Sequence, residues 1–303
     1  MIAGAGRYAP TPSGDLHLGN LRTALLAWLF ARHTGRQFRL RIDDLDPERS
    51  RDPAGQLADL AALGLTHDGP IVRQSARTSS YAKVLDGLIE AGLVYECFCT
   101  RREIAEAPTA PHHPPGAYPG TCRSLTSSEI EAKRVSGRTP ALRLRATVSA
   151  LTIEDELHGA YTGGVDDMVL RRSDGVHAYN LAVVVDDFDI GVDQVVRGDD
   201  LLPSTPRQAY LYDLLGYPRP SYVHVPLVLN AQGQRLAKRD GPVTMRELGL
   251  PAHKVLAVLG ASLGLCANDE QVDVGELLEC FDPAKLPREP WVYVDGLPSA
   301  HGI

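Results

Sequence analysis

The sequence predicts an α/β fold with a parallel sheet, interrupted by an inserted module and followed by a short C-terminal helical region. Strand-like and helix-like segments alternate over residues 6–96 and again from about residue 176, as in strand–helix–strand units whose strands run parallel. Between these stretches, residues 105–122 are rich in proline, alanine, histidine and glycine, which is typical of irregular backbone. The expected boundaries are 1–96 and 176–230 for the two halves of the sheet domain, 97–175 for the inserted module, and 231–303 for the C-terminal region.

The first half of the sheet domain begins with a short strand over residues 7–10 that enters a proline- and glycine-rich loop. A helix over 18–33 follows, because apolar residues such as Leu21 and Leu25 recur on one face and Gly35 stands where a helix-ending glycine belongs. Alternating apolar residues then indicate a strand over 38–42. Two more helices are expected, over 53–63 after Asp52 and over 81–89 before Gly92.

The remaining elements follow from the same patterns. The inserted module is expected to contain a charged helix over 126–136 and a β-like segment over 141–147. In the second half of the sheet domain, we interpret the apolar run 177–185 as a buried strand. Two last helices are expected, over 205–215 and, beginning at Pro251, over 251–265.

Bulk properties indicate a cytoplasmic globular protein. No run of 18 apolar residues exists, so no membrane span is expected, and the N-terminus lacks the segments of a secretion signal. The formal net charge of −7 argues against broad, non-specific nucleic-acid binding. A basic run from Arg101 to Arg138 is a local candidate, although such arginines are more often solvated surface.

The loop between the first strand and the first helix has the form of a phosphate-binding turn. Residues 7–20 read Arg-Tyr-Ala-Pro-Thr-Pro-Ser-Gly-Asp-Leu-His-Leu-Gly-Asn, and a helix N-terminus offers N–H groups and a positive dipole end to phosphate. His17 and Asn20 stand where side chains can touch that phosphate, and Gly19 removes a Cβ that would block the nucleotide. A plain turn with a capping histidine is the alternative.

A second segment, far along the chain, supports the prediction of a nucleotide site. Residues 235–239 read Arg-Leu-Ala-Lys-Arg and are followed by Asp240 and Gly241. Lys238 on such a loop can neutralise the charge that develops on a leaving pyrophosphate. A lone lysine is more often a surface residue, but together the two segments indicate a nucleotide site more specifically than either does alone.

Three of the five cysteines lie within 26 residues and indicate a metal site. Cys97, Cys99 and Cys122 have a spacing that suits tetrahedral zinc in a structural role, with one ligand to be found. Histidine is the commoner ligand on chemistry alone, and three reduced cysteines without a metal are the alternative. We interpret Cys266 and Cys280 as small buried apolar residues. The candidates for the fourth ligand are His112, His113 and Tyr118.

Several of these segments resemble one family. Residues 10–20 are similar to the HIGH region of class I aminoacyl-tRNA synthetases, and 235–239 are similar to their KMSKS loop. The segments 7–14, 41–46 and 196–206 resemble those of glutamyl-tRNA synthetases, so the resemblance spans about residues 6–300. Three positions depart from the pattern: Asn20 replaces the second histidine of HIGH, Ala237 replaces the first serine of KMSKS, and Asp43 stands where glutamate is usual.

The resemblance implies a Rossmann-type catalytic domain that uses ATP with Mg²⁺ to activate L-glutamate. It places His17 and Lys238 in catalysis, Arg7 and Arg197 at the glutamate side-chain carboxylate, and Asp43 with Tyr179 near the α-amino group. It also favours Tyr118 as the fourth zinc ligand in an acceptor-binding-like module. The remaining residues that it places are Pro12, Gly14, Gly19, Asn20 and Leu236 at ATP, and Ala9 and Thr11 at glutamate.

The short C-terminal region implies one branch of this family. No room is expected for the helical domain with which glutamyl-tRNA synthetases read the anticodon, so the resemblance narrows to their short paralogues. In that branch glutamate is activated without tRNA and is attached to the queuosine base in the anticodon of tRNA(Asp). We expect a monomer with one Zn²⁺. The alternatives are a truncated synthetase that charges a tRNA 3′ end, a nucleotidyltransferase acting on a small molecule, and a non-catalytic tRNA-binding protein.

Overall fold

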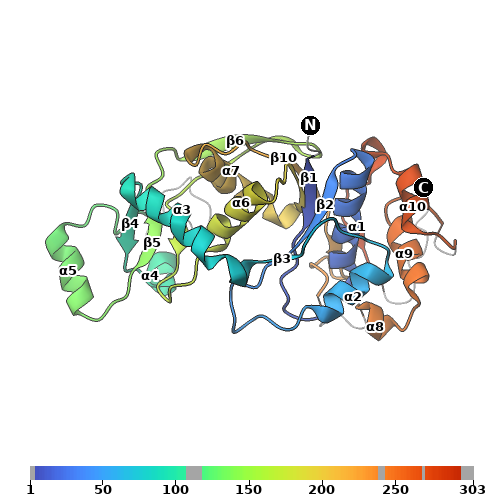
Figure 1. Cartoon of the computed structure of the whole chain (residues 1–303), viewed down its shortest axis with the longest axis horizontal. Coiled ribbons are helices and arrows are strands. Elements are labelled where there is room, and N and C mark those ends of the chain that lie inside the picture. The colour runs from blue at the N-terminus through green and yellow to red at the C-terminus, as the bar shows by residue number, and fades with distance from the viewer. Residues whose placement is uncertain (1–3, 107–117, 238–242, 268–269, 295–303) are drawn as a thin grey trace.

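A computed structural model describes residues 4–106, 118–237, 243–267 and 270–294 of the chain. The molecule is elongated (Figure 1): helices α4 and α5 lie at one end, helices α8, α9 and α10 lie at the other, and parallel strands occupy the middle. None of the helices in these ranges combines the length and the apolar character that a membrane span needs.

Two groups of parallel strands meet at β1. Strand β1 (Ala5–Tyr8) pairs with β2 (Gln37–Ile42), which pairs with the short β3 (Val72–Arg73). On its other side β1 meets the start of β9 (Gln194–Gly198), where Ala5 N donates to Gly191 O at 3.2 Å and Asp193 N donates to Ala5 O at 3.0 Å. Strand β9 then pairs in parallel with β10 (Ser221–Val225). Strands therefore extend the sheet on both sides of β1, with β2 on one side and β9 on the other. Where the order of strands reverses in this way, a ligand crevice forms at the carboxyl ends of the parallel strands.

The sequence explains the helix that follows β1. Helix α1 (Leu18–His33) has the bounds expected from its periodicity, and it ends at Thr34 before Gly35, whose φ of 69° suits glycine. His17 caps its first turn. The other helices of the sheet domain are α2 (Ala54–Ala62), α3 (Thr78–Glu90), α6 (Tyr179–Asp189) and α7 (Thr205–Leu214), with 3₁₀ turns at Gln74–Arg77 and Asp199–Ser204.

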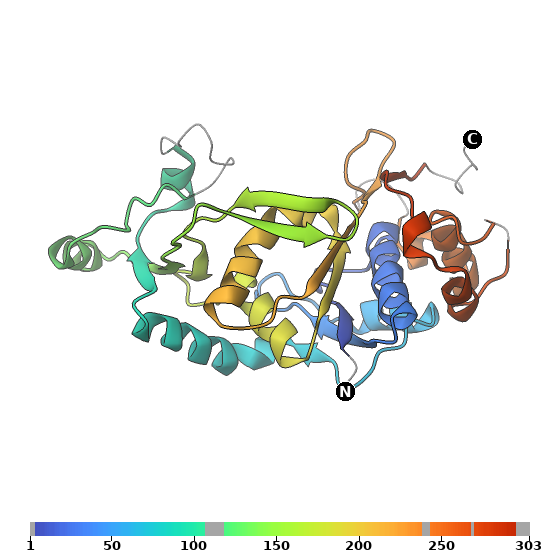
Figure 2. The same cartoon turned by 90° about the horizontal axis from the view of Figure 1, so that it is seen from above.

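The central part of the chain forms two small β structures. Strands β4 (Val94–Cys97), β5 (Ala141–Leu144) and β8 (Val169–Arg171) form an antiparallel sheet. The hairpin of β6 (Ala150–Asp155) and β7 (Gly159–Gly164) instead joins the main sheet, since β6 pairs with β10 (Figure 2). The expected module boundaries at 97 and 175 stay a prediction, and this hairpin ties the module to the sheet domain. The helices here are α4 (Arg101–Glu106) and α5 (Ser127–Val135).

The C-terminal region returns to the sheet domain. It contains the helices α8 (Met245–Leu248), α9 (Ala252–Ala261) and α10 (Val274–Cys280), and a 3₁₀ turn at Pro283–Lys285. Its last strand, β12 (Trp291–Val292), pairs in parallel with β11 (Val228–Leu229). The helix expected over 251–265 is present as α9, but it ends at Ala261.

The expected strand over 177–185 is wrong. The segment forms helix α6, in which seven consecutive residues from Leu181 to Asp187 are buried. Helices α3 and α7 and strand β8 pack around it. A helix that is covered on all sides has no polar face, so its short apolar run shows no 3.6-residue period and looks like a buried strand.

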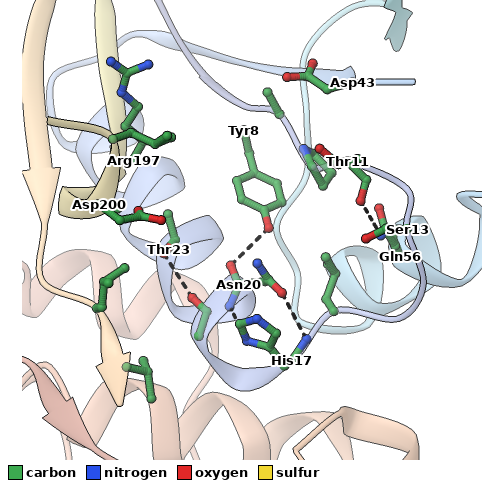
Figure 3. A pocket seen from close by; sticks show the side chains of 18 of the residues that line it. Tyr8, Thr11, Ser13, His17, Asn20, Thr23, Asp43, Gln56, Arg197 and Asp200 are labelled. Atoms are coloured by element: carbon green, nitrogen blue, oxygen red, sulfur yellow. Dashed lines mark hydrogen bonds between the residues drawn. The ribbon is translucent and has the colours of Figure 1, made fainter. Parts of the chain in front are cut away.

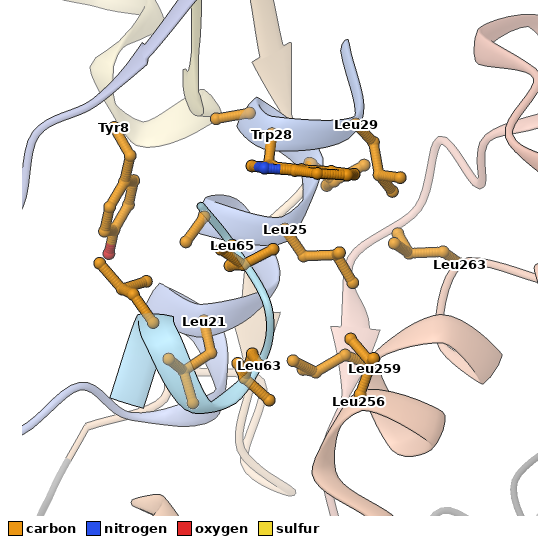
Figure 4. Close-up of a cluster of buried hydrophobic side chains, with 14 of the residues drawn as sticks. Tyr8, Leu21, Leu25, Trp28, Leu29, Leu63, Leu65, Leu256, Leu259 and Leu263 are labelled. Carbon is orange, nitrogen blue, oxygen red and sulfur yellow. The ribbon is translucent and has the colours of Figure 1, made fainter. Parts of the chain in front are cut away.

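The largest hydrophobic cluster lies between α1 and the C-terminal helices. Figure 4 shows leucines of α1 lying between the segment after α2 and helix α9. Leu21, Leu25 and Leu29 are fully buried there, with Leu63 on one side and Leu259 on the other. Because α1 also carries the loop that precedes it, this cluster fixes the position of that loop relative to the sheet.

Shortening one leucine of this cluster tests its contribution. Leu25→Ala is expected to lower the free energy of unfolding by about 2–5 kcal/mol, since it removes buried methyl groups and leaves a cavity. The measurement is urea unfolding followed by the fluorescence of Trp28, which lies in the same cluster. Val135→Ala is the matched control, because Val135 is 79% exposed and its truncation should change stability by less than about 0.5 kcal/mol. Equal effects of the two variants would contradict the assigned core.

Candidate functional site

A pocket of about 880 Å³ opens at the carboxyl ends of β1, β2 and β9. Figure 3 shows Arg197 and Asp43 at one end of it, His17 and Asn20 at the other, and Tyr8 between them. Most of the residues expected at ATP and glutamate lie in its lining: Arg7, Ala9, Thr11, Gly14, His17, Gly19, Asn20, Asp43, Tyr179, Arg197 and Leu236.

Two of the residues expected at ATP are not among these lining residues. Pro12 is buried and does not line the pocket, whereas Pro10 does. The carbonyl of Pro12 accepts a hydrogen bond from Arg51 N at 2.7 Å. Lys238 lies outside the described residues. Its neighbour Leu236 is buried in the pocket wall, so the segment that precedes Lys238 reaches the site.

His17 has a defined orientation at the start of α1. Asn20 N donates to His17 Nδ1 at 3.2 Å, and His17 N donates to Asn20 Oδ1 at 3.3 Å. Because Nδ1 accepts, the neutral ring carries its proton on Nε2, where it is a donor of the kind that phosphate requires. His17 therefore caps the helix, and this role is compatible with a place in the pocket beside the helix N-terminus.

Gly19 lies against the ring of His17. A Cβ there would lie 3.0 Å from His17 Cε1 and Nδ1, so the ring would have to shift by a few tenths of an ångström to admit a side chain. The glycine thus leaves room for the ring of His17, and because it also lines the pocket, the expected room for a nucleotide stays a prediction.

Some pocket residues were missed by the sequence analysis. Gln56 on α2 holds the loop, since its Nε2 donates to Gly14 O at 2.6 Å and to Thr11 O at 3.2 Å. Asp200 follows β9, lines the pocket and forms an ion pair with Arg235. No local pattern predicts these roles, because the partners come from distant parts of the chain.

Arg197 is a buried cation without a carboxylate. It is 5% exposed and lines the pocket. Its Nη1 donates to Gln208 Oε1 at 2.8 Å, its Nη2 to Thr205 Oγ1 at 2.8 Å, and its Nε to His224 Nε2 at 3.1 Å. Within the described residues no acidic side chain forms an ion pair with it. Burial lowers the pKa of Arg197, although arginine stays protonated in proteins, so a ligand carboxylate would compensate its charge.

Arg7 and Asp43 belong to a buried charge network. Arg7 Nε lies 3.3 Å from Asp187 Oδ1, and Arg41 pairs with both Asp187 and Asp43, the latter at 2.6 Å. Arg7 therefore has an ion-pair partner within the chain and also lines the pocket, and its place at the glutamate carboxylate stays a prediction. Burial raises the pKa of Asp43, and Arg41 opposes this shift. Tyr179 is 40% exposed at the pocket wall, so it is not a core residue.

The cysteine cluster has the geometry of a metal site. The sulfur atoms of Cys97, Cys99 and Cys122 lie within 4.8 Å of one another, and those of Cys99 and Cys122 are 3.5 Å apart. Thiolates around tetrahedral zinc at about 2.3 Å lie roughly 3.8 Å apart, which is close to this spacing. Burial raises the pKa of Cys99 to about 12, and the hydrogen bond with Cys122 acts in the same direction. A cation would remove this penalty, so the three residues together fit a metal.

Tyr118 completes the cluster. Its hydroxyl lies 3.3 Å from Cys97 Sγ and 3.9 Å from Cys99 Sγ, and Cys122 N donates to it at 2.8 Å. Burial raises the pKa of Tyr118. His112 and His113, the other candidates for the fourth ligand, lie outside the described residues.

Two smaller expectations have different outcomes. The basic run is largely neutralised, because Arg102, Arg123, Arg134 and Arg138 pair with carboxylates of Glu106, Asp167, Glu96 and Glu103.

Cys266 is half-buried and packs against the main hydrophobic cluster. Cys280 is exposed, so the expectation that Cys280 is buried is wrong. Leu277 is the buried residue of α10, and Cys280 is the last residue of this helix.

Comparisons with known proteins agree with this geometry. The family described as tRNA synthetases class I (E and Q), catalytic domain, matches residues 5–289. A glutamyl-Q tRNA(Asp) synthetase of Nocardia farcinica is 63% identical over 97% of this chain and 94% of that protein. Another from Nitratidesulfovibrio vulgaris is 45% identical over 95% and 94%.

Solved structures lead to the same family. A glutamate tRNA ligase of Elizabethkingia meningosepticum, crystallised in complex with its amino acid, superposes with a TM-score of 0.80 at 27% identity. The match covers 96% of this chain and 67% of that protein. The chain belongs to the class I tRNA synthetases of the E and Q family, and within them to the family of glutamyl-Q tRNA(Asp) synthetases.

Proposed function

We propose that this protein uses ATP to activate L-glutamate as its adenylate, without tRNA, and transfers the glutamate to the queuosine base of tRNA(Asp). The activation of glutamate is inferred from the environment of Arg197. This guanidinium is buried at the pocket wall, and the described residues supply no carboxylate for it. The names of the protein's relatives support the transfer to the queuosine base.

The pocket suits glutamate at one end. Three of the five N–H groups of Arg197 are used by Thr205, Gln208 and His224, which leaves one on each terminal nitrogen for the two oxygens of a carboxylate. The carboxylate of Asp43 and the hydroxyl of Tyr179, which also line the pocket, would accept hydrogen bonds from the α-ammonium group. This arrangement would direct the α-carboxylate toward the nucleotide.

The other end suits the phosphates of ATP. In the first step a glutamate α-carboxylate oxygen attacks the α-phosphorus, and pyrophosphate leaves. His17 Nε2 and the N-terminus of α1 would donate to phosphate oxygens, and Lys238 would bind the leaving pyrophosphate. Mg²⁺ would arrive with ATP and neutralise part of its charge. In the second step a queuosine hydroxyl attacks the carbonyl carbon of the adenylate, and AMP leaves.

We further propose that Cys97, Cys99, Tyr118 and Cys122 hold one structural zinc. The convergence of the three sulfurs and the tyrosine hydroxyl supports this set. Zinc there would tie the end of β4 to the segment around Tyr118 and Cys122.

Transfer of labelled glutamate to two RNAs tests the function. With ATP, we expect label on queuosine-containing tRNA(Asp), no label on tRNA(Asp) that lacks queuosine, and no label on tRNA(Glu). Protection of the anticodon nucleoside from periodate locates the product. Label only on tRNA(Glu) would indicate ordinary 3′-end charging, and absence of both label and ATP–pyrophosphate exchange would refute an activating enzyme.

Gly19→Ala tests the ATP end. The added Cβ would press on the ring of His17 at 3.0 Å and displace its Nε2, so kcat/KM for ATP should fall about tenfold or more. The measurement is ATP–pyrophosphate exchange at saturating glutamate. Gly87→Ala is the matched control, because a Cβ there meets no atom within 4 Å and the residue lies in α3, away from the pocket. An unchanged KM and kcat in Gly19→Ala would show that His17 is a capping residue only.

A further inference from the structure

A chain of buried polar groups extends behind Arg197. His224 on β10 lies directly opposite Arg197 on β9 in the parallel register, and it is fully buried. Its Nε2 lies 3.1 Å from Arg197 Nε, and its Nδ1 lies 2.6 Å from Asp155 Oδ2. Asp155 ends β6, so residues on three neighbouring strands form one line that points into the pocket.

The hydrogen-bonding roles in this line follow from the chemistry of each group. Arg197 Nε can only donate, so His224 Nε2 must accept. The ring proton of neutral His224 is therefore on Nδ1, where it is donated to Asp155. Asp155 is an acceptor only, and it also accepts from the backbone N–H groups of His224, Leu157 and His158, each at 3.0 Å. Thr205 Oγ1 also lies 3.0 Å from His224 Nε2, and with the ring proton on Nδ1 the hydroxyl can donate to it. Every donor in the line thus meets an acceptor.

The charges agree with these roles. Burial lowers the pKa of His224 and Arg197 acts in the same direction, while the hydrogen bond to Asp155 opposes them, and the pKa stays below its ordinary value. Burial raises the pKa of Asp155, but the hydrogen bond with His224 and the backbone donors outweigh it and leave the pKa lowered. A neutral imidazole therefore separates the carboxylate of Asp155 from the guanidinium of Arg197.

We propose that Asp155 and His224 are positioning residues for the substrate carboxylate: Asp155 fixes the Nδ1–H tautomer of His224, and His224 thereby fixes the orientation of the Arg197 guanidinium. The inference rests on the proposed role of Arg197 and goes beyond it. Asp155 does not reach Arg197, so it does not neutralise it as a direct ion pair would. The guanidinium is held rigidly, yet its charge remains for the ligand.

Asp155→Asn tests this relay with little change in shape. An asparagine that keeps its oxygen on Leu157 N and His158 N turns its NH₂ group toward His224, so Nδ1 must accept and the ring proton moves to Nε2. The Nε2–H of His224 then faces Arg197 Nε, which is also a donor. The remaining acceptor for this N–H is Thr205 Oγ1 at 3.0 Å, which already accepts from Arg197 Nη2. We expect the KM for glutamate to rise about 10- to 100-fold while the KM for ATP changes less than about twofold.

A double variant separates this relay from a general structural role. His224→Gln places an amide oxygen that can accept from Arg197 Nε whatever the state of Asp155. Adding Asp155→Asn to His224→Gln should therefore raise the KM for glutamate less than about twofold further. If the two residues had independent structural roles, the fold-changes of the single variants would multiply in the double variant. Multiplying effects would overturn the proposal. His158→Ala is the control, because the exposed side chain of His158 touches only the backbone oxygen of His224 in this line, and the substitution keeps the backbone N–H that donates to Asp155. It should leave the KM unchanged.

A direct reading of the tautomer keeps the proposal testable if a variant fails to fold. In the ¹⁵N NMR spectrum of histidine side chains, wild-type His224 should carry its proton on Nδ1. A proton on Nε2 in the wild type would overturn the proposal by itself. If the wild type shows no glutamate-dependent pyrophosphate exchange, the proposed function fails instead. If exchange is normal and Asp155→Asn leaves the KM for glutamate unchanged, only the relay fails.

Discussion

Arg197→Leu is expected to lower kcat/KM for glutamate by about two to four orders of magnitude, because it removes the group that would pair with the buried substrate carboxylate. Stability should fall less than it would for an arginine in a buried ion pair. A buried cation without a carboxylate costs free energy on folding, so its removal offsets part of the cost of leaving Gln208, Thr205 and His224 without a donor. ATP–pyrophosphate exchange against glutamate concentration and urea unfolding measure the two quantities.

Two further variants complete this test. Arg197→Lys keeps the charge but loses the planar fork, so it should recover only part of the activity. Arg36→Leu is the matched control, since Arg36 pairs at the surface with Asp193 at 2.8 Å and should affect exchange less than about twofold. Loss of several kcal/mol of stability in Arg197→Leu with normal exchange would mean that Arg197 is structural.

Cys122→Ser should remove the bound metal. We expect zinc content to fall from about one per chain to near zero, with affinity reduced at least about 100-fold, because one of the ligands is lost. Strand β4 should then lose its protection from hydrogen exchange, since Cys97 at its end would no longer be tied to Cys122. Protection of β1 in the main sheet should persist. Zinc measured by atomic absorption and exchange followed by mass spectrometry give both results.

The fourth ligand needs its own comparison. Tyr118→Phe should weaken zinc retention, whereas His112→Ala and His113→Ala should not, if the tyrosine hydroxyl beside Cys97 is the ligand. Cys280→Ser is the control for cysteine removal, because Cys280 is exposed and remote from the cluster in sequence. Full zinc content in Cys122→Ser would refute the site, and loss only in a histidine variant would reassign the fourth ligand.

Features encoded by neighbouring residues were predictable from the sequence. Helix α1 has the expected bounds, since an apolar face, a capping residue and Gly35 specify where it starts and ends. The close spacing of Cys97, Cys99 and Cys122 likewise predicted their convergence. In each case the deciding residues lie within one element or within 26 residues of one another, so the order of residues along the chain is enough.

Features that depend on packing were not predictable in this way. Helix α6 was mistaken for a strand, because burial on every side erases the periodicity that distinguishes the two. The surroundings of Arg7 and Arg197 were also beyond the sequence. Both are arginines in family motifs, but Arg7 meets Asp187, 180 residues away, whereas the side-chain partners of Arg197 in the part of the chain that the structure describes are neutral. Which buried charge is neutralised and which remains for a ligand is set by long-range contacts, and these exist only once the strands are paired and the helices are packed on them.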